Sequence, residues 1–297
     1  MKTKDFLLAV AVALIWGLNF SFIKLGVAHI DPFVLAGLRF ALTAFPLVLF
    51  LPRPAVAWRW LVVYGLSFGV GTWGLVTLAI RAGLAPGLAA WLLQSSAFIT
   101  PFLGLLWLGE LLSKAQKLGS AIALVGFILV VIATGGTTPA IGLVLVMSAA
   151  LALSIANLVV KRSSVKAAGI LGFVAWSCLF APLPLFALAA VNTGASAFTE
   201  LPQQLNGIAL SSLLFQVYPT TLFGYWVWNS LMARYSSAEV APIALLVPIF
   251  AMLFSWLIFG AMMSSGQTVG IVFIFLGLLT STFYPRLKLL WSKVSIR

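Results

Sequence analysis

Two polar side chains interrupt the first apolar run of the sequence. The stretch ALIWGLNFSFIK places Asn19 and Lys24 in a segment that is otherwise hydrophobic enough to cross a lipid bilayer. An amide that faces lipid loses its hydrogen bonds to water, which costs several kcal/mol. Asn19 lies just past the middle of the run. We therefore expect it to face the protein interior, either to hydrogen-bond a neighbouring helix or to contact a polar substrate.

Lys24 and Arg39 are the two basic residues that fall inside apolar runs. A charge at the centre of a bilayer costs at least about 2.5–3.5 kcal/mol on insertion scales, so retained charges usually face a cavity or a partner. In one interpretation these side chains extend to the membrane surface, or Lys24 pairs with Asp31. The functional interpretation is that one or both attract the carboxylate of a substrate.

Polar and aromatic side chains share helical faces in other apolar runs as well. Trp91, Gln94 and Ser95 lie within about 100° of one another on an ideal helix. Tyr218 and Tyr225 are seven residues apart and also share a face. Such mixed faces suit a cavity that stacks an apolar or aromatic group and hydrogen-bonds a zwitterion. The predicted substrate-binding residues are Trp16, Asn19, Lys24, Arg39, Trp91, Gln94, Ser95, Asn157, Tyr218 and Tyr225.

Residues for catalysis or metal binding are scarce. The chain has one histidine, His29, and one cysteine, Cys178. Its five acidic residues fall at the ends of apolar runs or between them: Asp5, Asp31, Glu110, Glu200 and Glu239. This set leaves little from which to build an intramembrane nucleophile and base or a metal cluster. The sequence also lacks the charge rings and repeated filter loops of a channel. We therefore expect no enzyme activity, no metal and no cofactor.

The composition is that of a membrane protein. Of the 297 residues, 63% are hydrophobic and 7% are charged, and the mean hydropathy is +1.16, whereas soluble domains are roughly 45–50% apolar. The net charge of +12 would suggest a nucleic-acid partner in a soluble protein. Here the basic residues lie in short clusters between apolar runs. The expected partners are therefore the lipid bilayer and a small-molecule substrate, with no nucleic acid and no indication of an oligomeric state.

The apolar runs predict ten membrane-spanning helices. About 20 apolar residues cross the roughly 30 Å of hydrocarbon. The predicted spans are 5–27, 33–51, 60–80, 86–108, 116–134, 140–161, 168–191, 207–229, 237–259 and 267–289. If the N-terminus is cytoplasmic, most lysines and arginines fall on the cytoplasmic side, and only Arg81 falls clearly outside. This bias predicts an inner-membrane protein with both termini in the cytoplasm.

The two halves of the chain repeat one another. Five residues recur at a constant offset of 151 positions (260 − 109 = 151): Gly109, Ser113, Gln116, Gly119 and Gly126 recur as Gly260, Ser264, Gln267, Gly270 and Gly277. Asn19 with Lys24 is echoed by Asn157 with Lys161 at the start of the second half. The repeat indicates that each half holds five spans.

The repeat predicts an all-α membrane protein of two five-helix domains, residues 1–138 and 139–297. Because five is odd, the second copy enters the membrane from the opposite face. Inverted-topology repeats are typical of transporters, in which one plan produces an inward-open and an outward-open state. Pro248 falls in the middle of the ninth span and is the predicted hinge, because proline can kink a helix.

The same residues resemble a known family. The five-helix repeat, the opening WGLNFSFIK and the Gly-Glu turn followed by Gln116, Gly119 and Gly126 are similar to the drug/metabolite transporter (DMT) superfamily. Within it they resemble the EamA-type ten-helix exporters. In length and aromatic content the chain is similar to the YddG-like amino-acid exporters. The second copy departs from the pattern, because Ala261 stands where the first copy has Glu110.

The resemblance implies alternating-access export of small neutral metabolites, with aromatic or other apolar amino acids as the expected substrates. Carriers of drugs, sugar phosphates or nucleotide sugars, and proton-coupled multidrug exporters, are the alternatives within the superfamily. Sugar phosphates would need several buried basic residues, and a cationic drug would need an acid within a span. Because proton coupling normally uses an intramembrane carboxylate, we expect facilitated diffusion or exchange driven by the substrate gradient.

Overall fold

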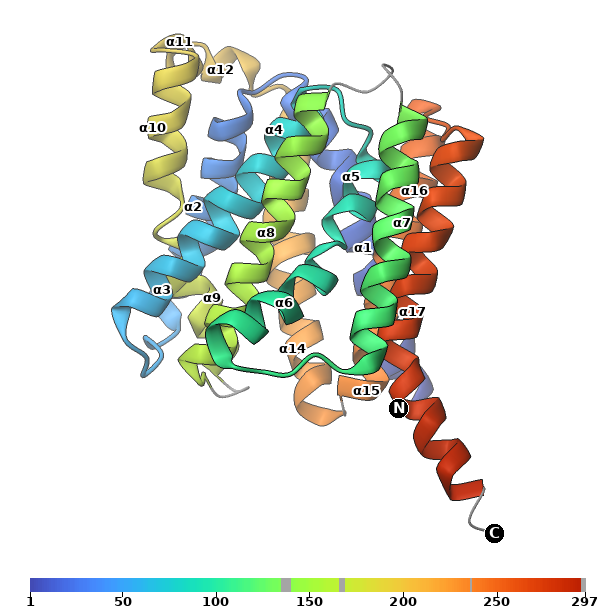
Figure 1. Ribbon diagram of the computed structural model, residues 1–297. Coiled ribbons are helices and arrows are strands. Elements are labelled where there is room, and N and C mark those ends of the chain that lie inside the picture. The colour runs from blue at the N-terminus through green and yellow to red at the C-terminus, as the bar shows by residue number, and fades with distance from the viewer. Residues whose placement is uncertain (135–139, 166–168, 236, 295–297) are drawn as a thin grey trace. The chain divides into compact units, whose positions relative to one another are not determined.

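The computed structural model describes residues 1–134, 140–165, 169–235 and 237–294, and every regular element in these ranges is a helix. The predicted domain boundary at 138/139 lies outside the described residues. In chain order (Figure 1) the helices are α1 (Thr3–Val27), α2 (Pro32–Phe50), α3 (Trp58–Tyr64), η1 (Gly65–Gly74), α4 (Leu75–Arg81), α5 (Pro86–Leu93), α6 (Ser96–Leu108), α7 (Lys114–Thr134), α8 (Ala140–Ser163), α9 (Ile170–Cys178), α10 (Pro182–Asn192), α11 (Ser196–Thr199), α12 (Leu201–Gln204), α13 (Gly207–Phe215), η3 (Gln216–Phe223), α14 (Gly224–Arg234), α15 (Ser237–Val240), η4 (Ala241–Leu245), α16 (Leu246–Phe259) and α17 (Ser265–Val294).

The helices have the lengths that a membrane requires. Eight helical runs in the described ranges are long and apolar enough to span a bilayer: Thr3–Val27, Pro32–Phe50, Trp58–Arg81, Pro86–Leu108, Lys114–Thr134, Ala140–Ser163, Ile170–Asn192 and Pro242–Phe259. A further apolar helix covers Ser265–Ser281, and α13, η3 and α14 form one continuous helical run over 207–234. The prediction of an all-α membrane protein is confirmed, and these runs are consistent with the ten predicted spans.

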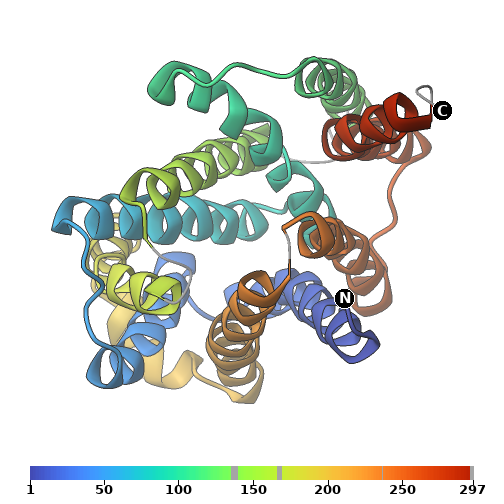
Figure 2. The same cartoon turned by 90° about the horizontal axis from the view of Figure 1, so that it is seen from below.

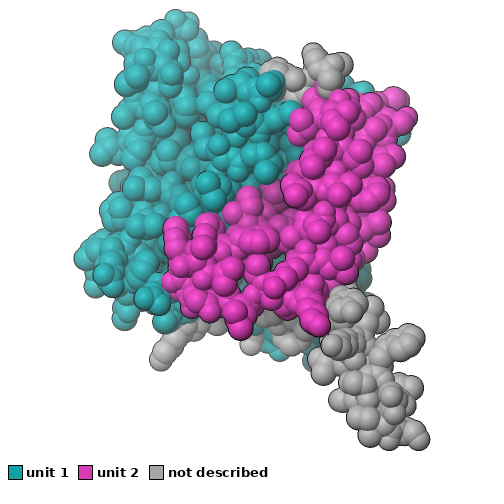
Figure 3. Space-filling model, viewed as in Figure 1, with its two compact units in different colours: residues 1–93, 139–261 teal, residues 94–138, 262–297 magenta. Residues whose placement is uncertain are grey.

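The chain forms two compact units, which Figure 3 colours separately. Unit 1 contains residues 1–93 and 139–261, and unit 2 contains residues 94–138 and 262–297. Each unit therefore draws helices from both halves of the sequence. Within unit 1, α1 packs against α4, α5, α13, α14 and α16, and α8 packs against η1 (Figures 1 and 2). The start of the chain thus lies against helices of its second half.

In unit 2, α7 packs against α17, which is its counterpart in the second repeat. A Cβ atom added to Gly119 would lie 2.6 Å from the Gly277 carbonyl oxygen, and one added to Gly126 would lie 2.5 Å from that of Gly270. Only glycine permits so close an approach of two backbones. Gly119 corresponds to Gly270 in the repeat, and Gly126 to Gly277. The pairing is therefore that of antiparallel helices related by a local two-fold axis, as an inverted repeat requires.

The other repeated residues end and begin helices. Gly109 and Gly260 have φ angles of 67° and 63° and follow the last residues of α6 and α16, and glycine adopts this left-handed conformation without strain. At the start of α7 the Ser113 amide donates to Gln116 Oε1 (2.8 Å), and the Gln116 amide donates to Ser113 Oγ (3.1 Å). The equivalent residues repeat this capping box before α17. Helix-end chemistry therefore accounts for much of the repeat.

The third helix of each repeat contains a π-helical segment, η1 in the first and η3 in the second. The segments begin at Gly65 and Gln216, which are 151 positions apart (216 − 65 = 151). A π-helix bonds each carbonyl to the amide five residues later, so it has more residues per turn than an α-helix. Pro219 lies inside η3, where its missing amide hydrogen removes one α-helical bond. Both segments therefore shift the direction in which later side chains point.

The fourth helix of each repeat is interrupted at the same place. The turn residues Gln94 and Ser95 separate α5 from α6, and η4 gives way to α16 after Leu245 (245 − 94 = 151). Pro248 therefore lies in the first turn of α16. A proline in the first turn removes no intrahelical hydrogen bond. The proline lies within the helical run of the ninth span, Pro242–Phe259, as predicted, and its role as a hinge stays a prediction.

Candidate functional site

Arg39 of α2 lies in the interior of unit 1, with 1% of its surface exposed. Its Nη2 donates a hydrogen bond of 3.3 Å to Oγ1 of Thr221 in η3. The guanidinium carbon lies 4.4 Å from the ring centroid of Trp73 in η1 and 5.6 Å from that of Phe40. Cation–π contacts contribute about 0.5–2 kcal/mol each, so these rings offset only part of the cost of burying the charge.

The Arg39 guanidinium has no carboxylate partner in the part of the chain that the structure describes. Neither of the ion pairs in that part involves it, and its Nε and Nη1 atoms are buried without a hydrogen-bond partner. Asp31 instead caps α2, where it accepts hydrogen bonds from the Phe33 and Val34 amides at 2.9 and 3.1 Å. A buried cation with unused donors is costly. An anionic group bound here would offset this cost.

Aromatic rings form a connected network beside this guanidinium, which we call the aromatic cluster. Its members are Trp16, Phe20, Phe40, Tyr64, Phe68, Trp73 and Tyr225. Phe68 connects several of them, with centroid distances of 6.1 Å to Phe40 and 6.3 Å to Trp73. Trp16 joins the network through Tyr225, at 5.5 Å. Rings that meet at these distances offer a large apolar surface on which another ring can pack.

Several polar side chains on the same helices are buried without hydrogen bonds. Asn19 is 0% exposed, and neither atom of its amide group has a partner. The hydroxyl groups of Thr43 and Thr220 and the indole nitrogen of Trp73 are likewise unpaired. The prediction that Asn19 faces the interior is confirmed, and its interpretation as a hydrogen-bonded link between helices is wrong in this conformation. Together with Arg39 these atoms provide both donors and acceptors for a polar ligand.

The π-helical segment η3 positions two contacts of the site. The indole Nε1 of Trp16 donates a hydrogen bond of 3.0 Å to the carbonyl of Thr220, and the next residue, Thr221, bonds Arg39. Gly224 is the first residue after η3, and a Cβ atom at this position would lie 2.6 Å from the Trp16 indole nitrogen. The absence of a side chain at Gly224 therefore makes room for the Trp16 ring.

Lys24 contacts α16, with its Nζ 4.2 Å from the ring centroid of Phe259. The pairing of Lys24 with Asp31 that was one interpretation of the sequence is not formed. The second carboxylate oxygen of Asp31 accepts from the Thr193 hydroxyl at 2.6 Å. Trp91 in α5 is buried, with 3% exposed. Substrate binding by Lys24 and Trp91 stays a prediction.

Tyr218 and Asn157 lie on exposed surface. Tyr218 is 53% exposed, whereas Tyr225 belongs to the aromatic cluster. The prediction that these tyrosines share a face is wrong. Most of the residues between them are π-helical, so the number of residues per turn differs from that of an α-helix and the two side chains point in different directions. Asn157 of α8 is also exposed. Gln94 and Ser95 belong to unit 2, and their part in binding stays a prediction.

Sequence reasoning missed most of the aromatic cluster and the threonine that bonds Arg39. Phe68 and Trp73 are five residues apart, a spacing that separates side chains by about 140° on an α-helix. On a π-helix, residues at this spacing are hydrogen-bonded neighbours on successive turns, and the two rings lie 6.3 Å apart. A search at the α-helical period cannot find this pair.

Known proteins resemble the chain over nearly its whole length. The model of the EamA-like transporter family matches residues 3–132 and 140–283. A probable amino-acid metabolite efflux pump of Salmonella typhimurium is 34% identical, covering 97% of this chain and 98% of that protein. The protein of the same name from Escherichia coli is 32% identical, covering 99% and 98%. A crystal structure with 17% identity superposes with a TM-score of 0.61, over 96% of this chain and 100% of that chain.

These matches test the class of function that the sequence predicted. The family model matches twice, once in each half, and the relatives are named as efflux pumps. The predictions of a multi-pass membrane transporter and not an enzyme, and of a small-molecule substrate, are thereby confirmed. The chain belongs to the EamA-like transporter family of the DMT superfamily.

Proposed function

We propose that this protein exports amino acids, with aromatic or other apolar side chains preferred, across the bacterial inner membrane by alternating access. The names of the relatives from Salmonella typhimurium and Escherichia coli support the substrate class. The clustering of basic residues between predicted spans supports cytoplasmic termini. In unit 1, Arg39 would bind the carboxylate of the substrate and the aromatic cluster would bind its side chain.

The main support for this proposal is the environment of Arg39. This side chain is buried, it has no carboxylate partner among the described residues, and its Nε and Nη1 are free to donate. A substrate carboxylate would supply the missing charge and accept these N–H groups, because guanidinium and carboxylate match in geometry. The substrate would thereby offset a desolvation cost that the empty protein bears alone.

The aromatic cluster recognises the rest of the substrate. Trp73 lies under the guanidinium and next to Phe20, whose centroid is 5.9 Å away. An apolar or aromatic side chain held at Arg39 by its carboxylate would reach these rings. Asn19, one residue before Phe20, offers its unpaired carbonyl oxygen to the ammonium group.

The burial of the site in this conformation supports alternation between two access states. The unpaired atoms of Arg39 and Asn19 are shielded from solvent in this conformation, so a substrate enters only after the packing around them opens. Inverted repeats supply two such openings, one on each side of the membrane. The described acidic residues lie at helix ends or in connections, so the transport cycle uses the substrate gradient and no proton carrier within a span.

Uptake of labelled amino acids into proteoliposomes tests the proposal. The wild type should take up phenylalanine saturably without a pH gradient, and Arg39→Gln should lower the rate at least tenfold. Arg59→Gln is the matched control, because Arg59 is exposed and stacks only on its neighbour Trp60, with its guanidinium carbon 5.0 Å from the ring centroid. Uptake of no amino acid by the wild type, or full uptake by Arg39→Gln, would refute the proposed function.

A further inference from the structure

A cavity of about 380 Å³, which we call the outer cavity, opens at the end of unit 1 opposite the N-terminus, where α11 and α12 lie (Figure 1). Its walls come from the connection between α1 and α2, the end of α4, and the segment 192–204. It shares no lining residue with the site at Arg39 and the aromatic cluster. Its volume falls in the range of about 300–1,000 Å³ that is usual for small-molecule sites.

The walls of this outer cavity are fixed by hydrogen bonds between its segments. The Thr193 hydroxyl donates to Asp31 Oδ2 at 2.6 Å, and the Asn206 amide nitrogen lies 3.1 Å from His29 Nδ1. These two contacts join both ends of the segment 193–206 to the connection between α1 and α2. The cavity is therefore a built feature of unit 1, and its Asp31 carboxylate is already engaged.

Besides Asp31, two opposite charges line the outer cavity, Arg81 and Glu200, and both side chains are exposed. Arg81 donates one N–H from Nη1 to the Val27 carbonyl at 2.8 Å. Glu200 accepts one hydrogen bond, from the Gln204 amide at 3.2 Å. Neither forms an ion pair in the described residues, so each keeps hydrogen-bonding capacity for a ligand. Ile30, an apolar residue, contributes to the same wall.

We propose that the outer cavity is a second binding site, which holds a free amino acid by its carboxylate on Arg81 and its ammonium group on Glu200. A zwitterion satisfies both charges at once, whereas a simple anion or cation satisfies one and is repelled by the other. The choice of an amino acid as the zwitterion rests on the proposed function. The outer cavity is open while the Arg39 site is closed, so it can hold a ligand in this conformation.

A thiol-protection experiment on the full-length protein in liposomes tests this site. Ser196 lines the cavity and is half-buried, whereas Cys178, the one native cysteine, is buried, with 2% of its surface exposed. Ser196→Cys therefore introduces one reactive position for a charged, membrane-impermeant thiol reagent. L-Phenylalanine should slow the modification at least fivefold. Arg81→Gln or Glu200→Gln in this background should abolish the protection.

Two further variants separate the outer cavity from the central site. Arg39→Gln should keep the protection, because it leaves the outer cavity intact. The exchange Arg81→Glu with Glu200→Arg should restore the protection that Arg81→Glu alone removes, because a zwitterion can bind in the reversed direction. Protection that persists in both Arg81→Gln and Glu200→Gln, or that is lost in Arg39→Gln, would overturn the inference.

Probes with one charge and a parallel transport assay complete the design. 3-Phenylpropionate lacks the ammonium group and phenethylamine lacks the carboxylate, so neither should protect as well as phenylalanine. Equal protection by either probe would overturn the zwitterion assignment. Transport of phenylalanine without protection would refute the outer site and leave the proposed function standing. Protection without transport of any amino acid would support the outer site and refute the proposed function.

Discussion

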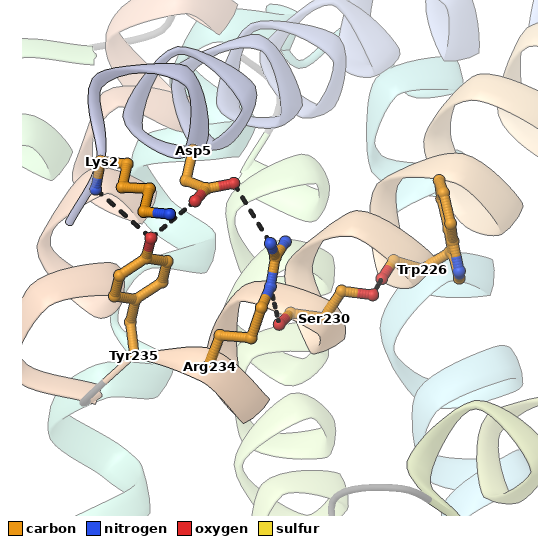
Figure 4. Close-up of polar contacts among 6 residues, drawn as sticks. All are labelled: Lys2, Asp5, Trp226, Ser230, Arg234 and Tyr235. Carbon is orange, nitrogen blue, oxygen red and sulfur yellow. Dashed lines mark hydrogen bonds and ion pairs between the residues drawn. The ribbon is translucent and has the colours of Figure 1, made fainter.

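Arg39 and Arg234 are both arginines on helices of unit 1, and their surroundings are opposite. Arg234 is exposed and lies 3.4 Å from Asp5 Oδ1, and its Nε donates to the Ser230 carbonyl at 3.1 Å (Figure 4). Arg39 is 1% exposed, lies against aromatic rings and has no ion pair in the described residues. One cation thus has a carboxylate and solvent, and the other has neither.

The N-terminal polar cluster around Arg234 extends across several helices. The Tyr235 hydroxyl donates to Asp5 Oδ2 at 2.6 Å and accepts from the Lys2 amide at 3.3 Å (Figure 4). The terminal ammonium group of Met1 lies 2.7 Å from a carboxylate oxygen of Glu239. These contacts join the start of α1 to the end of α14 and to α15, which belong to the second half of the chain.

From this difference we infer that the Asp5–Arg234 ion pair says less about function than the unpaired Arg39 does. Ion pairs at the surface contribute about 0–1 kcal/mol, and solvent already stabilises the Arg234 guanidinium, whose side chain is 55% exposed. A buried cation without a partner destabilises the empty protein, so its retention needs a reason outside stability. We assign that reason to the substrate. The predictions that follow compare the two regions directly.

Arg39→Met should produce the largest effect. Transport of phenylalanine should fall roughly 100-fold, which is about 2.7 kcal/mol, because the carboxylate loses its partner. The melting temperature in detergent should stay the same or rise, because methionine fills most of the space without a buried charge. Arg234→Met should leave transport within twofold of the wild type. A loss of stability with unchanged transport in Arg39→Met would show that Arg39 serves folding and not the substrate.

Trp73→Leu should have the next largest effect. It removes the ring that lies 4.4 Å from the Arg39 guanidinium carbon, and uptake of aromatic substrates should fall roughly tenfold, which is about 1.4 kcal/mol. Trp226→Leu is the matched control, because Trp226 is 58% exposed near the N-terminal polar cluster. The Ser230 hydroxyl donates to its backbone carbonyl, so the substitution leaves this hydrogen bond in place. Equal losses in the two variants would show that tryptophan is needed for folding and not for the substrate.

The Asp5–Arg234 pair should contribute little. A double-mutant cycle with Asp5→Asn and Arg234→Gln should give a coupling free energy of unfolding below about 1 kcal/mol. The coupling should decrease as the salt concentration rises, because the Arg234 side chain is 55% exposed and its charge is screened by salt, although Asp5 is largely buried. Transport by each variant should remain within twofold of the wild type. A coupling of several kcal/mol that salt does not change would place this pair with Arg39 as a buried interaction.

Tyr235 should produce the smallest effect, and this effect should change only at alkaline pH. Its hydrogen bond to Asp5 raises the pKa of the Tyr235 phenol above its ordinary value. A raised folded-state pKa contributes stability below the unfolded-state pKa of about 10, and this contribution is lost as pH rises through the folded-state pKa. The difference in melting temperature between the wild type and Tyr235→Phe should therefore be constant below pH of about 9 and shrink above about 10. A difference that grew with pH would show that the hydroxyl does not donate to Asp5.

Parts of the fold that depend on neighbouring residues could be read from the sequence. Gly109 ends a helix and the Ser113–Gln116 pair begins the next one, within a few positions of each other. Their recurrence 151 positions later predicted the repeat correctly because capping is local chemistry. Tyr218 shows where this reasoning fails: the π-helical segment changes the number of residues per turn, and no signal in the sequence fixes where such a segment begins and ends.

The sequence by itself determined that this is an all-α membrane transporter with repeated halves, because hydropathy and helix-end signals are properties of a chain read in one dimension. It also identified Arg39 and Asn19 as polar residues that lipid would not tolerate. Only the tertiary structure decided what surrounds them. Trp73 and Thr221 reach Arg39 from helices far apart in the chain, and the lack of a carboxylate partner for Arg39 among the residues that the structure describes is a fact about three-dimensional neighbours. Sequence spacing cannot supply it, because contacts between helices depend on how the helices pack.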